Sequence, residues 1–129
     1  MTQTFQDFKD TQDARNTIQL NITKYALMLC EALENDFTRQ YPTREKSKTF
    51  VLDSSGRKYH KIWDTDTCVN TNRESRSCHA FIDKRTGEVY KPASYKAPAK
   101  HVRYNLLSIQ SREECLERCD WAGGYLYIR

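Results

Sequence analysis

The sequence predicts an α+β fold in which a long N-terminal helix packs on an antiparallel sheet of four to five strands, followed by a short C-terminal helix. Apolar residues from Ile18 to Phe37 recur every three or four positions, which is typical of one helix face. Two pairs of strand-like segments follow, each joined by a short turn that contains glycine. With 129 residues, of which 38% are hydrophobic, the chain is predicted to be one domain spanning residues 1–129.

The helical pattern extends from about Arg15 to Gln40, and Pro42 is expected to prevent its continuation. The polar residues 1–13 are expected to be a loosely ordered N-terminal segment without a signal-peptide core. Such a helix would be roughly 38 Å long, which is more than a small sheet can cover. Additional apolar residues widen its apolar face: Leu20, Leu27 and Met28. We therefore expect a homodimer or higher homo-oligomer, with a curved core helix as the alternative.

The first predicted hairpin pairs Lys48–Asp53 with Arg57–Asp64 through the turn Ser54–Gly56. Gly56 is expected to supply a positive φ in this turn. The polar segment Asp66–Ser75 is interpreted as a loop.

The second predicted hairpin pairs Ser77–Lys84 with Glu88–Tyr95 through the turn Arg85–Gly87, with Gly87 in the left-handed conformation. Pro92 indicates an edge strand or an early end of the strand.

The rest of the chain contains a predicted loop, a short helix and a final strand. Lys96–Asn105 shows no clear period and is interpreted as a loop. Ser111 and Glu114 form a capping-box pattern that predicts a helix from Ser111 to about Cys119. Tyr125–Ile128 is suited to a last strand.

Positive charge is concentrated in the second part of the chain. Residues 1–40 contain four basic and six acidic residues, and residues 41–129 contain seventeen basic and eleven acidic ones. The densest basic stretch, 84–103, contains six basic residues and one acidic residue, Glu88. This stretch is predicted either to attract phosphate groups or to be an ordinary solvated surface.

Side-chain alternation in the third predicted strand separates a core face from a candidate binding face. Cys78, Ala80 and Ile82 are small or apolar and are assigned to the core. His79 and Phe81 then lie on the opposite face. A three-residue turn would place Phe81 beside Lys91, which suits a stacked base next to a phosphate. A register one residue different would place Tyr90 there instead, and Phe81 packed under a loop or a partner subunit is the alternative interpretation.

Sequence motifs of catalysis are scarce. The four glycines form no phosphate-binding loop, and the odd number of cysteines, five, favours free thiols over disulfides or a zinc site. Convergence of His60, Asp64 and Asp83 would be needed for a small metal-dependent nuclease. We therefore predict a protein that is not an enzyme and has no cofactor or metal. No apolar run approaches the roughly 20 residues of a membrane span.

Two stretches resemble small proteins of tailed bacteriophages, including phages of cyanobacteria. They are Gly56–Ile62 and Ser77–Lys100, which includes Lys-Pro-Ala-Ser and Ala-Pro-Ala-Lys. Most members of that group are known only as hypothetical proteins. Size and element order also resemble the Thoeris anti-defence sponge proteins of phages, which bind immune signals of the cyclic ADP-ribose type without cleaving them.

This resemblance implies a phage protein that sequesters a phosphate-bearing nucleotide signal in the cytoplasm of the infected bacterial host. A module that binds nucleic acid or inhibits a host protein through the same basic patch is the first alternative, and a small metal-dependent nuclease is the second. The predicted ligand-binding residues are Arg57, His79, Phe81, Lys91, Tyr95, Lys96, Lys100 and Arg103.

Overall fold

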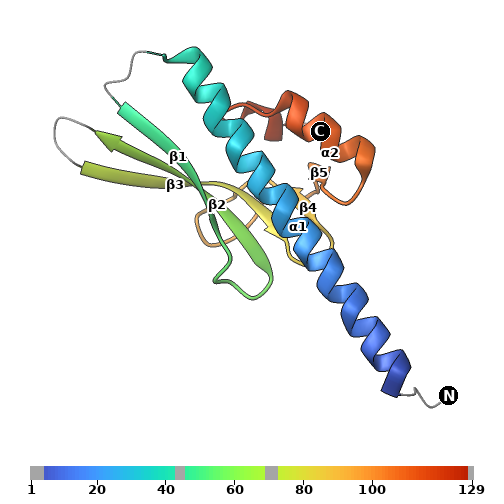
Figure 1. Cartoon of the computed structure of the whole chain (residues 1–129). Coiled ribbons are helices and arrows are strands. Elements are labelled where there is room, and N and C mark those ends of the chain that lie inside the picture. The colour runs from blue at the N-terminus through green and yellow to red at the C-terminus, as the bar shows by residue number, and fades with distance from the viewer. Residues whose placement is uncertain (1–4, 43–45, 69–72, 128–129) are drawn as a thin grey trace.

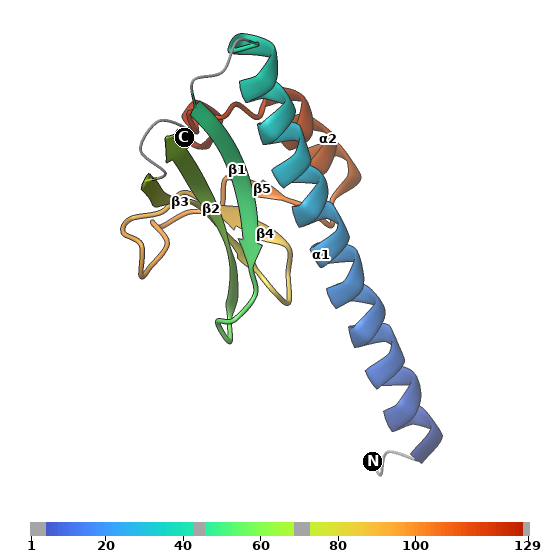
Figure 2. The same ribbon diagram turned by 60° about the vertical axis from the view of Figure 1, so that its left-hand side comes forward.

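The structure is a computed structural model that describes residues 5–42, 46–68 and 73–127. Its elements in chain order are α1 (Phe5–Gln40), β1 (Lys46–Asp53), β2 (Tyr59–Cys68), β3 (Arg73–Asp83), β4 (Glu88–Tyr90), β5 (Tyr104–Asn105), α2 (Ile109–Arg118) and the 3-10 helix η1 (Gly124–Leu126). The strands form one antiparallel sheet in the order β1-β2-β3-β4-β5. α1 lies across one face of this sheet, here called the inner face, with α2 beside it (Figures 1 and 2). The predicted α+β fold is confirmed.

The second half of α1 provides the centre of the hydrophobic core. Ile22, Ala26, Leu29 and Leu33 follow each other at three- and four-residue steps, and each is 0% exposed. They pack on inner-face residues of the sheet and on residues from the C-terminal part of the chain: Phe50, Ile62, Ala80, Ile82, Val89, Tyr104, Leu106, Cys115, Tyr125 and Leu126. The inner face of the sheet thereby forms the hydrophobic core together with α1.

α1 is longer at its N-terminus than the sequence predicts. It begins at Phe5 rather than near Arg15, and it ends at Gln40 as expected. Residues 9–20 are all exposed, and this half of the helix projects beyond the sheet (Figure 2). No helix in the described part of the chain is long and apolar enough to span a membrane.

The first hairpin differs from the prediction in its turn. Gly56 does not have a positive φ, whereas Gly87 of the second hairpin does, at 74°. The first turn is instead closed by Asp53, whose Oδ1 accepts hydrogen bonds from the backbone N–H and the hydroxyl of Ser55. β2 and β3 both extend into the predicted loop Asp66–Ser75, of which residues 69–72 lie outside the described residues.

The strand Glu88–Tyr95 is predicted to be longer than it is. β4 ends at Tyr90, because Pro92 provides no N–H to continue the ladder. A single bridge between Pro92 and Pro98 then holds the following loop closed. β5 lies in the segment predicted to be a loop.

The C-terminal part also differs in detail. Ser108, rather than Ser111, is the N-cap of α2, and its hydroxyl accepts a hydrogen bond from Ser111 N. The Ser111 hydroxyl is used elsewhere, because it accepts a hydrogen bond from Asn105 N at 2.8 Å. Gly124–Leu126 forms η1 in place of the predicted last strand, and Ile128 lies outside the described residues.

A buried lysine connects the sheet with the C-terminal segment. Lys48 Nζ lies 2.7 Å from Asp64 and 3.2 Å from Asp66, and its side chain is 7% exposed. The rings of Phe37 and Trp121 lie 5.5 and 5.0 Å from the same ammonium group. The two carboxylates compensate the buried charge, and the two rings hold α1 and the C-terminal segment around it.

Replacement of a core residue is expected to cost far more stability than the same replacement on the surface. Ile62 is 0% exposed, whereas Ile109 is 65% exposed. Ile62→Ala should lower the free energy of unfolding by about 2–5 kcal/mol, because it leaves a cavity in the core. Ile109→Ala is the matched control and should change it by less than about 0.5 kcal/mol. Urea denaturation measures both, and equal losses would contradict the assignment of the inner face.

Candidate functional site

A β-bulge places His79 on the inner face. Ile62 pairs with Ala80 and Trp63 pairs with Cys78, so His79 is an extra residue without a partner on β2. Its Nε2 lies 2.8 Å from the hydroxyl of Tyr125, a residue of the core. The prediction that His79 shares a face with Phe81 is therefore wrong, because the bulge shifts the alternation of side chains. His79 is 7% exposed.

Phe81 is buried on the outer face of the sheet. It pairs with Tyr90 rather than with Lys91, since the turn between β3 and β4 has four residues, 84–87, instead of three. Tyr59 packs edge-on against the Phe81 ring at 5.7 Å, and Lys61 Nζ lies 5.4 Å from the ring centre. The ring is 0% exposed, so it offers no face on which a base could stack. The predicted pair of Phe81 and Lys91 does not exist.

The loop that follows β4 lies above this outer face and carries other predicted site residues. Lys61 Nζ donates a 2.8 Å hydrogen bond to the backbone carbonyl of Tyr95, which fixes the loop to β2. The Tyr95 side chain is 61% exposed, with Lys96 Nζ 5.5 Å from its ring centre. Lys91 is directed elsewhere, since its Nζ lies 4.0 Å from the ring of Tyr127. Tyr95 and Lys96 thus remain accessible to a ligand, while Lys91 contacts the C-terminal segment.

Arg103 has a structural role in this loop. Its Nε donates to the carbonyl of Leu126 at 2.7 Å, and one terminal nitrogen donates to the carbonyls of Lys100 and His101 at 3.2 and 2.9 Å. These contacts tie the loop to the C-terminal segment. Lys100 itself is exposed, and its side chain forms no ion pair with another described residue.

Arg57 lies in a small basic cavity at the opposite end of the strands. Arg57, Lys58, Asp83 and Arg85 line this cavity, whose volume is about 280 Å³. Asp83 accepts hydrogen bonds from the backbone N–H groups of Arg85 and Thr86 at 2.8 and 3.2 Å, so its carboxylate caps the turn between β3 and β4. Neither Arg57 nor Arg85 has a side-chain hydrogen bond or ion pair with another described residue.

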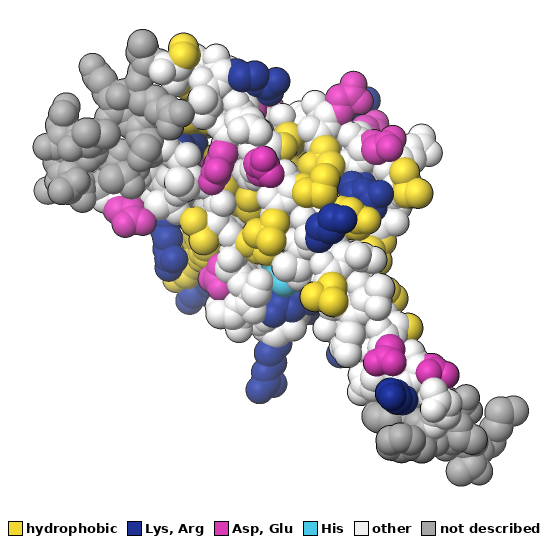
Figure 3. Space-filling view, in the orientation of Figure 1, with side chains coloured by type: hydrophobic (Ala, Val, Ile, Leu, Met, Phe, Trp, Pro, Cys, Tyr) yellow, Lys and Arg dark blue, Asp and Glu magenta, His cyan; other side chains and the backbone are white. Residues whose placement is uncertain are grey.

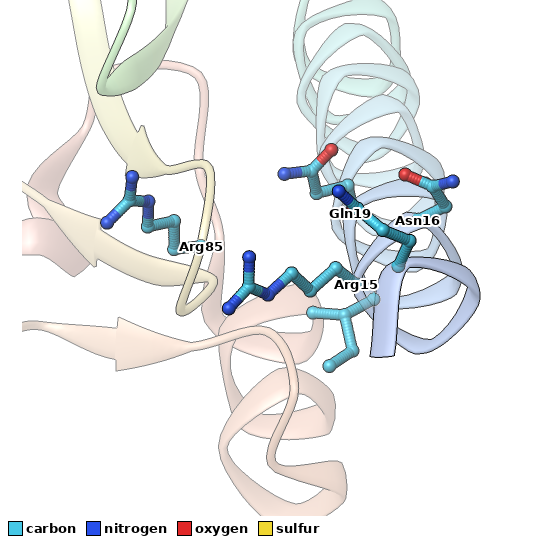
Figure 4. A pocket seen from close by; sticks show the side chains of 6 residues that line it. Arg15, Asn16, Gln19 and Arg85 are labelled. Carbon is cyan, nitrogen blue, oxygen red and sulfur yellow. The ribbon is translucent and has the colours of Figure 1, made fainter. Parts of the chain in front are cut away.

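A larger cavity adjoins the first one, because Arg85 lines both. Its volume is about 610 Å³, and its other lining residues come from the projecting half of α1: Gln12, Arg15, Asn16, Ile18 and Gln19. Figure 4 shows Arg15 extending from α1 across the gap towards the turn that carries Arg85. Arg15 likewise has no ion pair with any residue in the described ranges. We call the two cavities together the basic cleft.

The basic cleft has an excess of positive charge among the described residues that line it. Three arginines and one lysine, Arg15, Arg57, Lys58 and Arg85, face a single carboxylate, Asp83, which already accepts two backbone hydrogen bonds. Guanidinium groups bind phosphates and carboxylates through paired hydrogen bonds. The arrangement therefore favours a ligand that carries negative charge.

Sequence reasoning found only part of this cleft. Arg57 is among the predicted site residues, but Arg15 and Arg85 are not. No local pattern connects Arg15 with Arg85, because they become neighbours only through the packing of α1 on the sheet. The signal that the sequence does contain is the position of Arg15 on the sheet-facing side of the helix, four and seven residues before Gln19 and Ile22.

The residues considered for a nuclease do not converge. Asp64 is paired with Lys48, Asp83 caps its own turn, and His60 Nδ1 lies 2.7 Å from the hydroxyl of Ser54. Within the described ranges, no group of three or more histidine, cysteine or acidic side chains is placed to hold a metal ion. The arrangement gives no support to metal-dependent cleavage.

The cysteines that the structure describes are unreactive by environment. Cys30, Cys78, Cys115 and Cys119 are free thiols, while the side chain of Cys68 lies outside the description. Burial raises the pKa of Cys78 to about 11 and that of Cys115 to about 12. Thiols with such pKa values stay protonated at neutral pH, so they are poor nucleophiles.

A family model matches residues 5–128 of the chain. The chain belongs to the family of unknown function DUF7717. No curated protein and no solved structure matches it. The match includes both α1 and the C-terminal segment, so the whole fold, with its basic cleft, falls within one DUF7717 unit.

Stability is expected to fall when the pH is lowered from about 6.5 to about 4. Burial, together with the charge of Lys48, lowers the pKa of His79 from 6.5 to about 4. Between these values the unfolded chain binds a proton that folded His79 does not, so the free energy of unfolding decreases, by about 3 kcal/mol in total. The pKa of His60 is also lowered by burial, which acts in the same direction.

Urea denaturation at a series of pH values measures this dependence. His79→Gln should remove most of the slope between pH 6.5 and 4, because glutamine does not titrate. His101→Gln is the control, since the side chain of His101 is exposed. An unchanged slope in His79→Gln would show that another group is responsible.

Phe81→Ala is expected to act on stability and not directly on ligand binding. Because the ring is 0% exposed, its loss should lower the free energy of unfolding by about 3–5 kcal/mol. Tyr95→Ala, at a residue 61% exposed, is the matched aromatic control and should cost less than about 0.5 kcal/mol. A melting temperature of Phe81→Ala equal to that of the parent would contradict the burial described here.

Proposed function

We propose that this chain is a non-enzymatic binding protein that captures a phosphate-bearing nucleotide in the basic cleft. The observation that carries the proposal is a group of three arginines, none of which forms an ion pair with another described residue, around two adjoining cavities: Arg15, Arg57 and Arg85. Solvated surface cations are spread over convex surfaces, whereas these are gathered in a concave one. Concave sites with a few converging polar groups are the usual form of ligand pockets.

The two cavities suit two parts of a nucleotide. The smaller one, at about 280 Å³, contains Arg57, Lys58 and Arg85 and has room for a phosphate or diphosphate group. The larger one, at about 610 Å³, lies within the size range of small-molecule sites and is lined by amide side chains from α1. Amides both donate and accept hydrogen bonds, so they suit the edges of a base and the hydroxyls of a ribose.

Capture without cleavage fits the chemistry of the lining residues. Arginine stays protonated at any physiological pH, so it binds anions but does not transfer protons. Asp83, the carboxylate of the cleft, is occupied by the backbone of its own turn. The cleft therefore contains groups suited to bind a phosphate, whereas its carboxylate caps the turn between β3 and β4 and is not placed to act as a catalytic base.

For the identity of the nucleotide we rely on the resemblance to phage anti-defence sponges. This resemblance makes signals of the cyclic ADP-ribose type, in the cytoplasm of an infected bacterium, the first ligands to test. The same cleft would serve any nucleotide with comparable phosphate and ribose groups. The exposed residues Tyr95, Lys96 and Lys100 of the loop after β4 form the alternative site.

Isothermal titration calorimetry with cyclic ADP-ribose, ADP-ribose, pyrophosphate and adenosine tests the proposal. Binding of the phosphate-bearing probes is expected, with adenosine binding weakly or not at all. Arg85→Gln should weaken binding about 10- to 150-fold, which corresponds to one charge-assisted hydrogen-bonded contact of about 1.5–3 kcal/mol. Lys96→Gln is the matched control, because it removes an exposed cation outside the cleft.

Three outcomes would contradict the proposal. Absence of binding by every probe up to about 1 mM would remove the function. A loss in Lys96→Gln but not in Arg85→Gln would move the site to the loop. Affinity for a single-stranded oligonucleotide that falls steeply with salt would indicate a nucleic-acid binder, because several counterions are then released.

A further inference from the structure

The projecting half of α1 has no packing partner in the described chain. Residues 9–20 are all exposed, and they contain one alanine among several asparagine, aspartate and threonine residues. A helical segment of this length and composition is only marginally stable in water without tertiary contacts. An additional surface that packs on it would account for its helical order.

The side of α1 that faces away from the sheet carries an ordered stripe of exposed residues. At about 100° per residue, the members of the stripe lie within about 60° of each other around the helix. In chain order they are Lys9, Asp13, Leu20, Lys24, Leu27 and Glu31. Figure 3 views this side, with acidic and basic side chains together at the projecting end and hydrophobic ones where α1 crosses the body.

The stripe is apolar at its centre and charged on both sides. Leu20 is 70% exposed and Leu27 is 52% exposed. None of the four charged residues in the stripe forms an ion pair with another described residue. Along the chain, Lys9 and then Asp13 precede Leu20, and Lys24 and then Glu31 follow it, so a positive charge comes before a negative one on both sides of Leu20.

This order of charges is self-complementary only in an antiparallel pair. With a two-fold axis at Leu20, Lys9 meets Glu31 of the partner subunit. Asp13 then lies opposite Leu27 of the partner subunit and about 4.5 Å along the helix axis from Lys24 of the partner subunit. A parallel pair would instead place each charge beside its own copy, where like charges repel. Each attractive contact occurs twice in a two-fold pair, because the interface is isologous.

We propose that two copies of this chain associate through an antiparallel pair of α1 helices centred on Leu20. The overlap of residues 9–31 spans about 33 Å at 1.5 Å per residue, and it covers the projecting half on both copies. Charges flanking an apolar seam set the orientation of helix pairs in this way in coiled coils. The arginines of the basic cleft stay accessible, since Arg15 lies on the other side of the helix, whereas Asn16, which also lines the larger cavity, lies next to the stripe.

Size-exclusion chromatography with light scattering, at about 10 and 100 µM protein, tests this arrangement. The parent should have twice the chain mass of 15.2 kDa. Leu20→Lys places two like charges at the axis and should raise the dimer dissociation constant at least about 10-fold. The exposed position of Leu20 lets the variant fold, which an unchanged melting transition of the monomer confirms.

An exchange of the charges at positions 13 and 24 distinguishes the proposed helix pair from non-specific association. Asp13→Lys alone should weaken the dimer, because it places a second positive charge beside Lys24 of the partner subunit. Asp13→Lys combined with Lys24→Asp should restore it, since the pair is remade with its signs reversed. Glu117→Lys, an exposed charge reversal on α2, is the control and should leave the mass unchanged.

Three results would overturn the proposal. They are a 15.2 kDa monomer at 100 µM for the parent, a dimer that persists in Leu20→Lys, and a double variant that is no better than Asp13→Lys. Nucleotide titrations on Leu20→Lys separate this question from the basic cleft, which the substitution does not touch.

Discussion

The packing of the second half of α1 on the sheet is the interaction on which the rest of the structure depends. It buries Ile22 and Leu33 completely and defines the inner face of every strand. It also places the turn between β3 and β4 directly beneath the helix, where Gly87 leaves no room for a side chain. A Cβ at Gly87 would lie 3.2 Å from Leu107 and 3.5 Å from Ile22, and its φ of 74° disfavours other residues. The basic cleft exists because α1 continues past this turn.

The positive charge of the chain divides into cations that hold the fold and cations that are free to bind. Lys48 is enclosed by carboxylates and rings, Lys84 donates to the carbonyls of Ser54 and Gly56, and Arg103 donates to three carbonyls. Several of the cations behind the net charge of +4 are therefore held by contacts within the protein and are not available to a ligand. The cations without such contacts gather in the cleft beside α1, so the candidate site lies there and not in the loop after β4. Lys84 and Arg85 differ in this respect although they are neighbours in sequence.

Elements with regular periodicity were predictable from the sequence, and the places where regularity fails were not. The apolar repeat from Ile18 to Phe37 locates α1, and glycine-containing turns locate both hairpins. The bulge at His79 cannot be recognised in the sequence of β3 alone, because it depends on how β3 pairs with β2. The pairing of Phe81 with Tyr90 depends on one residue of turn length. The cleft could be predicted only in part, since Arg15 and Arg85 meet through tertiary packing.

Three regions of α1 meet different environments along one continuous helix. Towards the sheet its apolar residues form the core, and beyond the sheet that same side, at Arg15, lines the cleft. Its solvent side carries the charged stripe around Leu20. The helical conformation of residues 9–20 therefore positions both proposed binding surfaces, although the core contacts begin only at Ile22. A shorter helix that began near Asn21 would keep the core residues from Ile22 onwards, but it would have neither Arg15 over the cleft nor Leu20 on its outer side. The extension of α1 towards its N-terminus thus adds no residue to the hydrophobic core, and it carries residues of both proposed binding surfaces.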